Sequence, residues 1–278
     1  MEWNIVCDSS CDLRSEIGET DILYSKVPFV ISSGEADFTD DNTLSVPDML
    51  ARVERETAIT HTSCPTPMSW YDKFRSGDNI IAITISKALS GSYNSAMVAK
   101  KMILEECPDK NIAVINSNGT SGSAVILVEE IVGMINRRFE PDQIIHRAEE
   151  LVKDVKIIFS LCSFDNLIKN GRMKKITGKI ASKLGFWGMG IGDKTGNILI
   201  LDKVRGTKCM LQKLIANIEE RGIPKSKLII SHCLNAPLAN ELKLLIKKKW
   251  KNIDVRIMET SGINSYYAER GGLIVGYI

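Results

Sequence analysis

The sequence has no long apolar run and few histidines. No window of its 278 residues approaches the roughly 18 consecutive apolar residues of a membrane-spanning helix. Residues 1–5 lack the basic start and the long apolar stretch of a signal peptide, so we expect a cytoplasmic protein. Because the chain has only three histidines, a zinc cluster has few possible ligands, and we expect no metal site.

The cysteines also lack a metal-binding or disulfide pattern. There are seven, an odd number, and no Cys-x-x-Cys pair occurs. Cys7, Cys11 and Cys64 lie in loop-like sequence, whereas most of the others lie in or beside apolar runs. Reduced and mostly buried thiols are the expected state.

Three motifs of catalysis and nucleotide binding are missing. Residues 119–122 (Gly-Thr-Ser-Gly) are one residue short of the Gly-x-Ser-x-Gly elbow of serine hydrolases. The glycine-rich run 188–192 is followed by Asp193, where a dinucleotide-binding loop requires glycine. Gly178-Lys179 is followed by isoleucine, so no Walker sequence exists. We therefore expect no cofactor.

The composition is that of a soluble globular protein. The chain is 44% hydrophobic and 25% charged, which excludes disordered, collagen-like and low-complexity classes. At about 150 residues per domain, its length favours two domains.

The net charge of +2 hides an asymmetry between the two halves of the chain. Residues 1–150 hold 13 Lys+Arg and 24 Asp+Glu (13 − 24 = −11), whereas residues 151–278 hold 23 and 10 (23 − 10 = +13). The halves attract each other. Solvated faces are the simpler interpretation, and an anionic partner of the basic half (phosphates, an acidic protein or anionic lipid) is the alternative.

The first half alternates short apolar strands with helices. Strands are expected at 3–7, 27–31, 80–85 and 112–116. Helices are expected at about 45–56, 66–75, 92–106 and 121–138, the first two with a hydroxyl cap and a proline in the first turn. This regular order predicts a parallel sheet with helices on both faces.

The second half shows a different pattern. After a helix from Pro141 to about 153 and a strand at 156–162, seven glycines between 171 and 196 indicate loops and short helices. Strands are expected at 197–204, 227–231, 254–258 and 273–278, and helices at 207–221 and 236–250. The predicted fold class is therefore α/β with two domains. Residues 1–153 form a parallel α/β/α domain, and residues 154–278 form a two-layer α/β domain with a mixed sheet and helices on one side.

Hydroxyl side chains gather near predicted helix starts. The segment 62–67 contains Thr62, Ser63 and Thr66, and Ser90-Gly91-Ser92 follows the third strand. A helix N-terminus with extra hydroxyl donors suits a carboxylate or a phosphate, although N-capping alone also explains such residues.

Two further segments carry polar groups that suit a binding site. Residues 8–13 directly follow the first strand, where the ligand crevice of an open parallel sheet lies, although an Asx or Ser turn also explains them. Arg172 lies in a predicted turn and is either a surface residue or the charge partner of a bound anion.

Two other functions remain as alternatives to anion binding. His232, just past a strand, could act as base for Ser92 or Ser63 in a serine-nucleophile hydrolase. The second alternative is that the basic second half binds the phosphates of a nucleic acid. We expect no such partner.

An ordered set of segments resembles the DegV family of bacterial fatty-acid-binding proteins. These segments are 5–13, 27–28, 37–40, 62–66, 89–96 and 171–173, and the resemblance runs from residue 5 to about residue 215. It implies two α/β domains with one long-chain fatty acid between them. It also implies a non-catalytic subunit that presents the acid to a separate fatty acid kinase, which phosphorylates the carboxylate.

The resemblance also assigns binding residues. Thr62 and Ser63 fall on the family's Thr-Ser-x-Pro loop, Ser90 and Ser92 on its Ser-Gly-Ser/Thr-Tyr loop, and Arg172 on its Gly-Arg-Ile turn. By this resemblance, these five residues hold the fatty acid carboxylate while the tail is buried.

The resemblance extends to a partner surface, with departures from the family pattern. Residues 203–206, with Lys203 and Arg205, resemble a basic segment that faces the kinase in the family. Cys64 replaces the usual glutamine, and Thr260 stands where some kinase partners have a headgroup histidine. These departures concern the kinase more than lipid binding, because the hydroxyls and an arginine remain. Transient contact with a membrane is compatible with the sequence.

Overall fold

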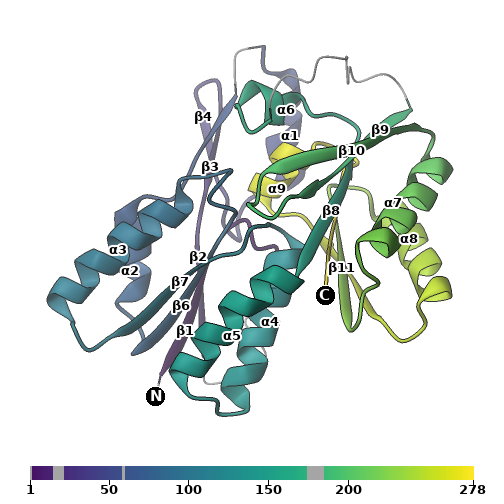
Figure 1. Ribbon diagram of the computed structural model, residues 1–278. Helices are drawn as coiled ribbons and strands as arrows, with labels where there is room; N and C mark the ends of the chain where they lie inside the picture. The colour runs from purple at the N-terminus through teal and green to yellow at the C-terminus, as the bar shows by residue number, and fades with distance from the viewer. Residues whose placement is uncertain (1, 15–21, 58–59, 174–184) are drawn as a thin grey trace.

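A computed structural model of the chain describes residues 2–14, 22–57, 60–173 and 185–278. These residues form three sheets with helices packed around them (Figure 1). The fold is α/β with one parallel and one mixed sheet, as the sequence predicts.

The first sheet has four parallel strands. Their order is β2 (Ile22–Val27), β1 (Trp3–Asp8), β6 (Asn79–Thr84) and β7 (Asn111–Asn116). The central strands β1 and β6 are buried along their whole length, as expected for a sheet covered on both faces.

Alternate residues of these strands pack against helices on opposite faces. Val6 and Ile80 lie on the face of the sheet that packs against α2 (Pro67–Phe74) and α3 (Ser92–Glu106). Ile5 and Ile81 lie on the opposite face, which packs against α4 (Gly122–Asn136) and α5 (Pro141–Asp154). The period of two along a strand thus produces the three layers.

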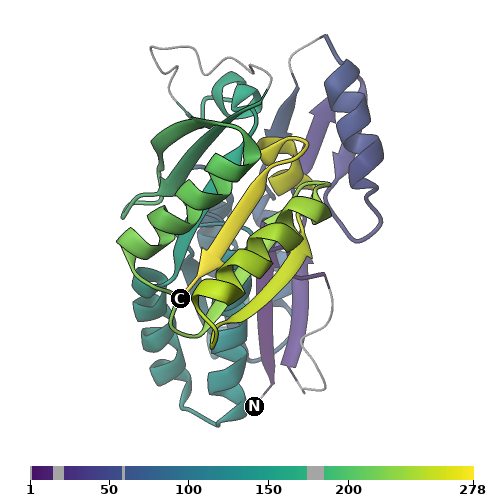
Figure 2. The same ribbon diagram turned by 90° about the vertical axis from the view of Figure 1, so that its right-hand side faces the viewer.

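The second sheet is mixed and has six strands. Their order is β10 (Ile198–Arg205), β9 (Phe186–Gly192), β8 (Lys156–Leu161), β13 (Leu273–Tyr277), β11 (Lys227–His232) and β12 (Asp254–Glu259). Only β11 and β12 pair in parallel. Helices α7 (Thr207–Arg221) and α8 (Ala236–Lys249) cover one face, which is toward the viewer in Figure 2.

Helix α4 joins the two sheets. A Cβ on Gly276 of β13 would overlap the backbone of Gly122 and Ser123, so helix and strand approach more closely there than a side chain allows. Nearby, Lys227 lies 2.8 Å from Glu130, and Arg256 lies 2.5 Å from Glu129. The opposite charges of the two halves therefore meet at this contact.

A small third sheet lies above the first in the view of Figure 1. It is antiparallel, in the order β4 (Ala36–Thr39), β3 (Val30–Ser33), β5 (His61–Ser63). It packs with α1 (Val46–Arg55) and two short helices, α6 (Asp165–Lys169) and α9 (Gly262–Ala268), over the inner face of the mixed sheet.

Two expectations about the elements were wrong. The strand expected at 27–31 is two strands, because the chain leaves the parallel sheet after Val27 and Phe29 N–H donates to Ser9 Oγ. Residues 186–192 form the strand β9 instead of loops and short helices. Residues 174–184 of the glycine-rich segment lie outside the described residues. We keep the division between residues 153 and 154 as a proposal; the parallel sheet lies before it and the mixed sheet after it.

Candidate ligand-binding cavity

A largely apolar cavity lies between the parallel and the mixed sheet. Its volume is about 800 Å³, counting the open space at its mouth. Loops after β6 and β7 border it on one side, where the carboxyl ends of parallel strands form the usual ligand crevice. The inner face of the mixed sheet and helix α9 border it on the other.

The body of the cavity is built from alternate residues of β8 and from its neighbours. Ile157, Phe159 and Leu161 point to the cavity, whereas Ile158 between them packs in the core beneath α7 and α8. Ile198 of β10 and Ile274 of β13 extend the same surface. Such a surface can bury an apolar chain but offers it no hydrogen bonds.

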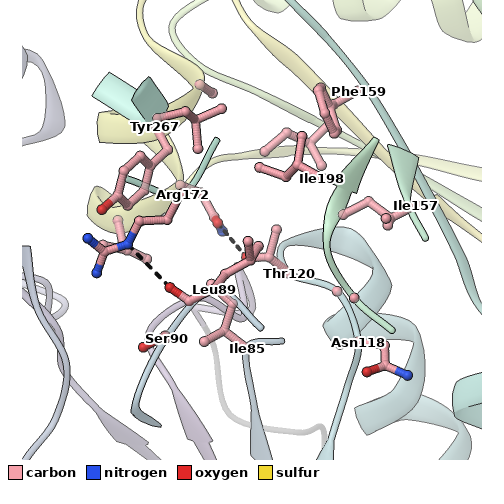
Figure 3. Close-up of a pocket in the computed structure, with 18 of the residues that line it drawn as sticks. Ile85, Leu89, Ser90, Asn118, Thr120, Ile157, Phe159, Arg172, Ile198 and Tyr267 are labelled. Atoms are coloured by element: carbon pink, nitrogen blue, oxygen red, sulfur yellow. Dashed lines mark hydrogen bonds between the residues drawn. The ribbon is translucent and has the colours of Figure 1, made fainter. Parts of the chain in front are cut away.

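One end of the cavity is polar. Thr62 Oγ1 and Tyr267 Oη are 2.7 Å apart, and Ser90 and Arg172 also line the cavity. Figure 3 shows Arg172 next to Tyr267, with Ser90 below it. Arg172 Nη1 donates to the Asn170 carbonyl at 2.6 Å, and its Nε donates to the Leu89 carbonyl at 3.3 Å. Within the described residues the guanidinium has no carboxylate partner, so a bound carboxylate could supply one.

Tyr267 is the polar-end residue that the sequence did not reveal. Burial raises the pKa of its phenol, so the hydroxyl stays protonated and can donate a hydrogen bond to an anion. It comes from the short helix α9, for which the sequence showed no periodic signal. No pattern in the sequence could have indicated that its hydroxyl meets Thr62.

Ser92 lies behind the cavity wall. It is fully buried, and its Oγ donates to Asp8 Oδ2 at 2.7 Å. Asp8 also accepts hydrogen bonds from Ile85 N–H at 2.9 Å and from Ser10 Oγ at 2.5 Å. Ser92 is not part of the cavity lining; it ties the loop 85–92, which carries Leu89 and Ser90, to the end of β1.

Ser63 also lies outside the cavity lining. Successive residues of a strand point to opposite sides, and on β5 Thr62 faces the cavity while Ser63 is exposed. Thr66 caps α2, because its Oγ1 accepts from Ser69 N–H at 3.2 Å. The structure therefore brings Thr62, Ser90 and Arg172 together but neither Ser63 nor Ser92, and contact of all five with a carboxylate stays a prediction.

The segment 8–13 positions α9. Asp12 accepts hydrogen bonds from Ser261 N–H at 2.8 Å and from Asn264 Nδ2 at 2.7 Å. Asp40 accepts from the N–H groups of Gly262 and Ile263 at 2.6 and 2.9 Å. These two buried carboxylates hold the helix that carries Tyr267.

The residues of the hydrolase alternative are not assembled. His232 Nδ1 accepts from Asn235 N–H at 3.2 Å, and burial lowers the pKa of this imidazole. Ser92 donates to Asp8 instead, and no hydrogen bond between His232 and either Ser92 or Ser63 occurs in the described part of the chain. Thr260 lies beside His232, where its hydroxyl contacts Ser265 Oγ at 2.7 Å rather than the cavity.

The predicted partner segment lies on the outer strand β10. Lys203 Nζ lies 4.8 Å and Arg205 Cζ 5.7 Å from the centre of the Phe186 ring. Both side chains are exposed, on the same side of the strand and away from the cavity lining.

The described residues contain neither a metal-binding cluster nor a membrane-spanning helix. Between residues 2 and 278, apart from the gaps given above, no three His, Cys, Asp or Glu side chains are grouped to hold a metal ion. None of the described helices is long and apolar enough to cross a membrane.

The sequence and the fold correspond to those of a known family. The DegV family, described as uncharacterised proteins, matches residues 2–278, and this chain belongs to it. A DegV domain-containing protein of Streptococcus pyogenes is 34% identical over 278 residues, covering 100% of this chain and 99% of the other. A DegV domain-containing protein of Streptococcus gordonii is 35% identical over the same shares.

Solved structures of similar proteins contain fatty acids. The Fatty Acid Kinase (Fak) B3 protein of Streptococcus pneumoniae, loaded with linoleic acid, has a TM-score of 0.96 and 31% identity over 100% of this chain and 99% of the other. A DegV family protein of Eubacterium eligens, loaded with heptadecanoic acid, has a TM-score of 0.95 and 33% identity over 99% of each chain.

Proposed function

We propose that this protein binds one long-chain fatty acid in the cavity, with the carboxylate at the polar end and the tail along the mixed sheet. The observation that carries the proposal is Arg172, a cation at one end of an apolar cavity that has no carboxylate partner among the described residues. The acids bound by the Streptococcus pneumoniae and Eubacterium eligens proteins support it.

The energetics of burial favour such a ligand. Each buried CH₂ contributes about 0.8 kcal/mol, so about fifteen methylenes contribute on the order of 12 kcal/mol before ordering costs are subtracted. The tail therefore supplies the affinity. The polar end fixes the orientation, because buried donors without an acceptor cost about 1–3 kcal/mol each.

Within this proposal the five predicted residues have different roles. Thr62, Ser90 and Arg172, together with Tyr267, contact the carboxylate. Ser92 supports the loop through Asp8, and Ser63 stabilises β5 beside Thr62.

The protein is further proposed to act without catalysis, as a cytoplasmic subunit that presents its fatty acid to a kinase. The similarity to the Fak B3 protein supports this partnership. Lys203 and Arg205, exposed on β10, offer a basic surface for the kinase.

The first test is to extract the purified protein with organic solvent and analyse the extract by mass spectrometry, with native intact mass as a check on stoichiometry. We expect about one long-chain fatty acid per chain. A protein that is empty and also rejects added fatty acids would contradict the proposal. Labelling by a serine-reactive fluorophosphonate would instead favour the hydrolase.

A further inference from the structure

The far end of the cavity borders a second cleft. Asn118, Ile157 and Gly192 line both the cavity and a cleft of about 1660 Å³, counting open space. A Cβ on Gly192 would lie 3.0 Å from Ile157 Cγ2 and 3.2 Å from the Asn118 carbonyl oxygen, so the three residues are packed together. Figure 3 shows Ile157 and Asn118 across the cavity from Arg172 and Tyr267. Single residues therefore separate the two spaces.

The cleft combines apolar walls with cations. It lies between the end of α5, the start of β8, the β9–β10 turn and the end of α7. Its apolar residues include Val152, Val155, Ile191 and Leu199. Its basic residues are Lys153, Lys156, Lys194 and Arg221, and its acidic residues are Asp193 and Glu220, so cations outnumber carboxylates. An apolar chain that emerges from the cavity would thus meet positive charge.

Three of the four cations have no acidic partner in the described residues. Only Lys153 is paired, with Glu150 at 2.6 Å. Lys156 Nζ donates to the Arg221 carbonyl at 2.7 Å, and Lys194 is exposed at the β9–β10 turn. The Asp193 carboxylate is occupied within that turn, where it accepts from the N–H groups of Thr195 and Asn197.

Arg221 has a buried donor that is not used within the described residues. Its Nε is buried and has no hydrogen-bond acceptor among them. A buried donor on a charged group is costly when it has no acceptor, and a carboxylate or phosphate oxygen is its strongest partner.

We propose that this cleft is an anion-binding subsite at the far end of the acyl cavity, formed by Arg221, Lys156 and Lys194. Because Gly192 has no side chain, displacement of the Ile157 side chain joins the two spaces. A long-chain α,ω-dicarboxylic acid would then place one carboxylate at Arg172 and the other at Arg221. If the anion is the second carboxylate of a bound dicarboxylic acid, the subsite rests on the proposed function. A free anion such as inorganic phosphate offers the same negatively charged oxygens and does not depend on fatty acid binding.

The test compares hexadecanoic acid, hexadecanedioic acid and inorganic phosphate by calorimetry. The proteins are the wild type, Arg221→Gln, the exposed variant Lys194→Gln, and Lys251→Gln, an exposed lysine outside the cleft, as the control. We expect the wild type to bind the dicarboxylic acid within tenfold of the monocarboxylic acid. Arg221→Gln should weaken the dicarboxylic acid at least tenfold, Lys194→Gln about threefold, and neither should change hexadecanoic acid binding.

Each outcome has a distinct meaning. If phosphate binds the fatty-acid-loaded wild type but not the Arg221→Gln variant, the result supports the subsite, with a free anion as its ligand. If the dicarboxylic acid binds more than a hundredfold more weakly than hexadecanoic acid, and phosphate does not bind, the subsite is excluded. If hexadecanoic acid itself does not bind, the proposed function fails, and phosphate binding alone then decides on the subsite. Retained hexadecanoic acid binding by Arg221→Gln shows that this variant is folded.

Discussion

Arg172 carries a full positive charge at the polar end of the cavity, where, among the described residues, its donors reach only backbone carbonyls. A carboxylate there would form charge-assisted hydrogen bonds, the strongest available to a guanidinium. We predict that Arg172→Gln weakens binding of a C16 or C18 fatty acid by ten- to a hundredfold, about 1.4–2.8 kcal/mol, in calorimetric titration. The exposed Arg75→Gln serves as control; equal losses in both variants would contradict the assignment.

The buried carboxyl of Asp8 leads to a second prediction at the residue scale, which concerns the pH dependence of the free energy of unfolding. Burial raises the pKa of this carboxyl above its ordinary 3.8, although the hydrogen bonds from Ser10, Ser92 and Ile85 oppose the shift. The folded state therefore binds this proton more tightly than the unfolded chain does. The contribution of Asp8 to the free energy of unfolding therefore falls as the pH rises from about 3.8 through the raised pKa of this carboxyl.

Asp8→Asn removes that titration. We expect its free energy of unfolding, measured with urea at several pH values from 4 to 7, to fall less steeply with pH than that of the wild type. The exposed Asp109→Asn is the matched control and should keep the wild-type slope. A wild-type slope in Asp8→Asn would show that Asp8 titrates alike in the folded and unfolded chains.

At the scale of elements, strand β9 shows where sequence patterns stop being informative. Its glycines indicate loops when read alone, yet aromatic rings occupy the space that side chains would take: a Cβ on Gly188 would overlap Phe164, and one on Gly190 would lie 2.5 Å from Phe159 Cζ. The partner that makes glycine necessary lies 31 residues away in the chain for Gly190 (190 − 159). Local periodicity carries no such information.

Other elements followed from the sequence because their signals are local. The buried runs of β1 and β6 and the capped start of α1, where Ser45 Oγ accepts from Asp48 N–H at 3.4 Å, need no distant partner. The site divides in the same way. Arg172 could be predicted as the charge partner of an anion, whereas Tyr267 depends on how Asp12 and Asp40 hold α9.

The contact between β9 and β8 gives a prediction for the element. Gly190→Ala should lower the free energy of unfolding by about 1–3 kcal/mol, because the new methyl group meets the Phe159 ring and the Leu199 carbonyl. The measurement is urea denaturation. Adding Phe159→Leu should restore part of the loss, since the ring is then absent. A single variant as stable as the wild type would show that the ring moves freely.

At the scale of the whole molecule, the two sheets share helix α4 and the cavity. The buried residues of α4 belong to the same cluster as Ile81 of β6 and Ile229 of β11. Glu129 and Glu130 add ion pairs to Lys227 and Arg256 at its exposed edge. If either sheet separated from α4, buried residues of the cluster that both sheets share would become exposed.

The shared helix and the shared cavity predict one unfolding transition for both halves of the chain. A fatty acid that touches both sheets binds only the folded molecule, so at a free concentration of 1,000 times its Kd it adds about 4 kcal/mol to the free energy of unfolding. Calorimetry of the delipidated and reloaded protein should show a single peak that moves to higher temperature as a unit. Two peaks, with only one shifted by the acid, would mean that the halves fold separately and that the ligand contacts one of them, because a ligand held between both sheets stabilises both at once.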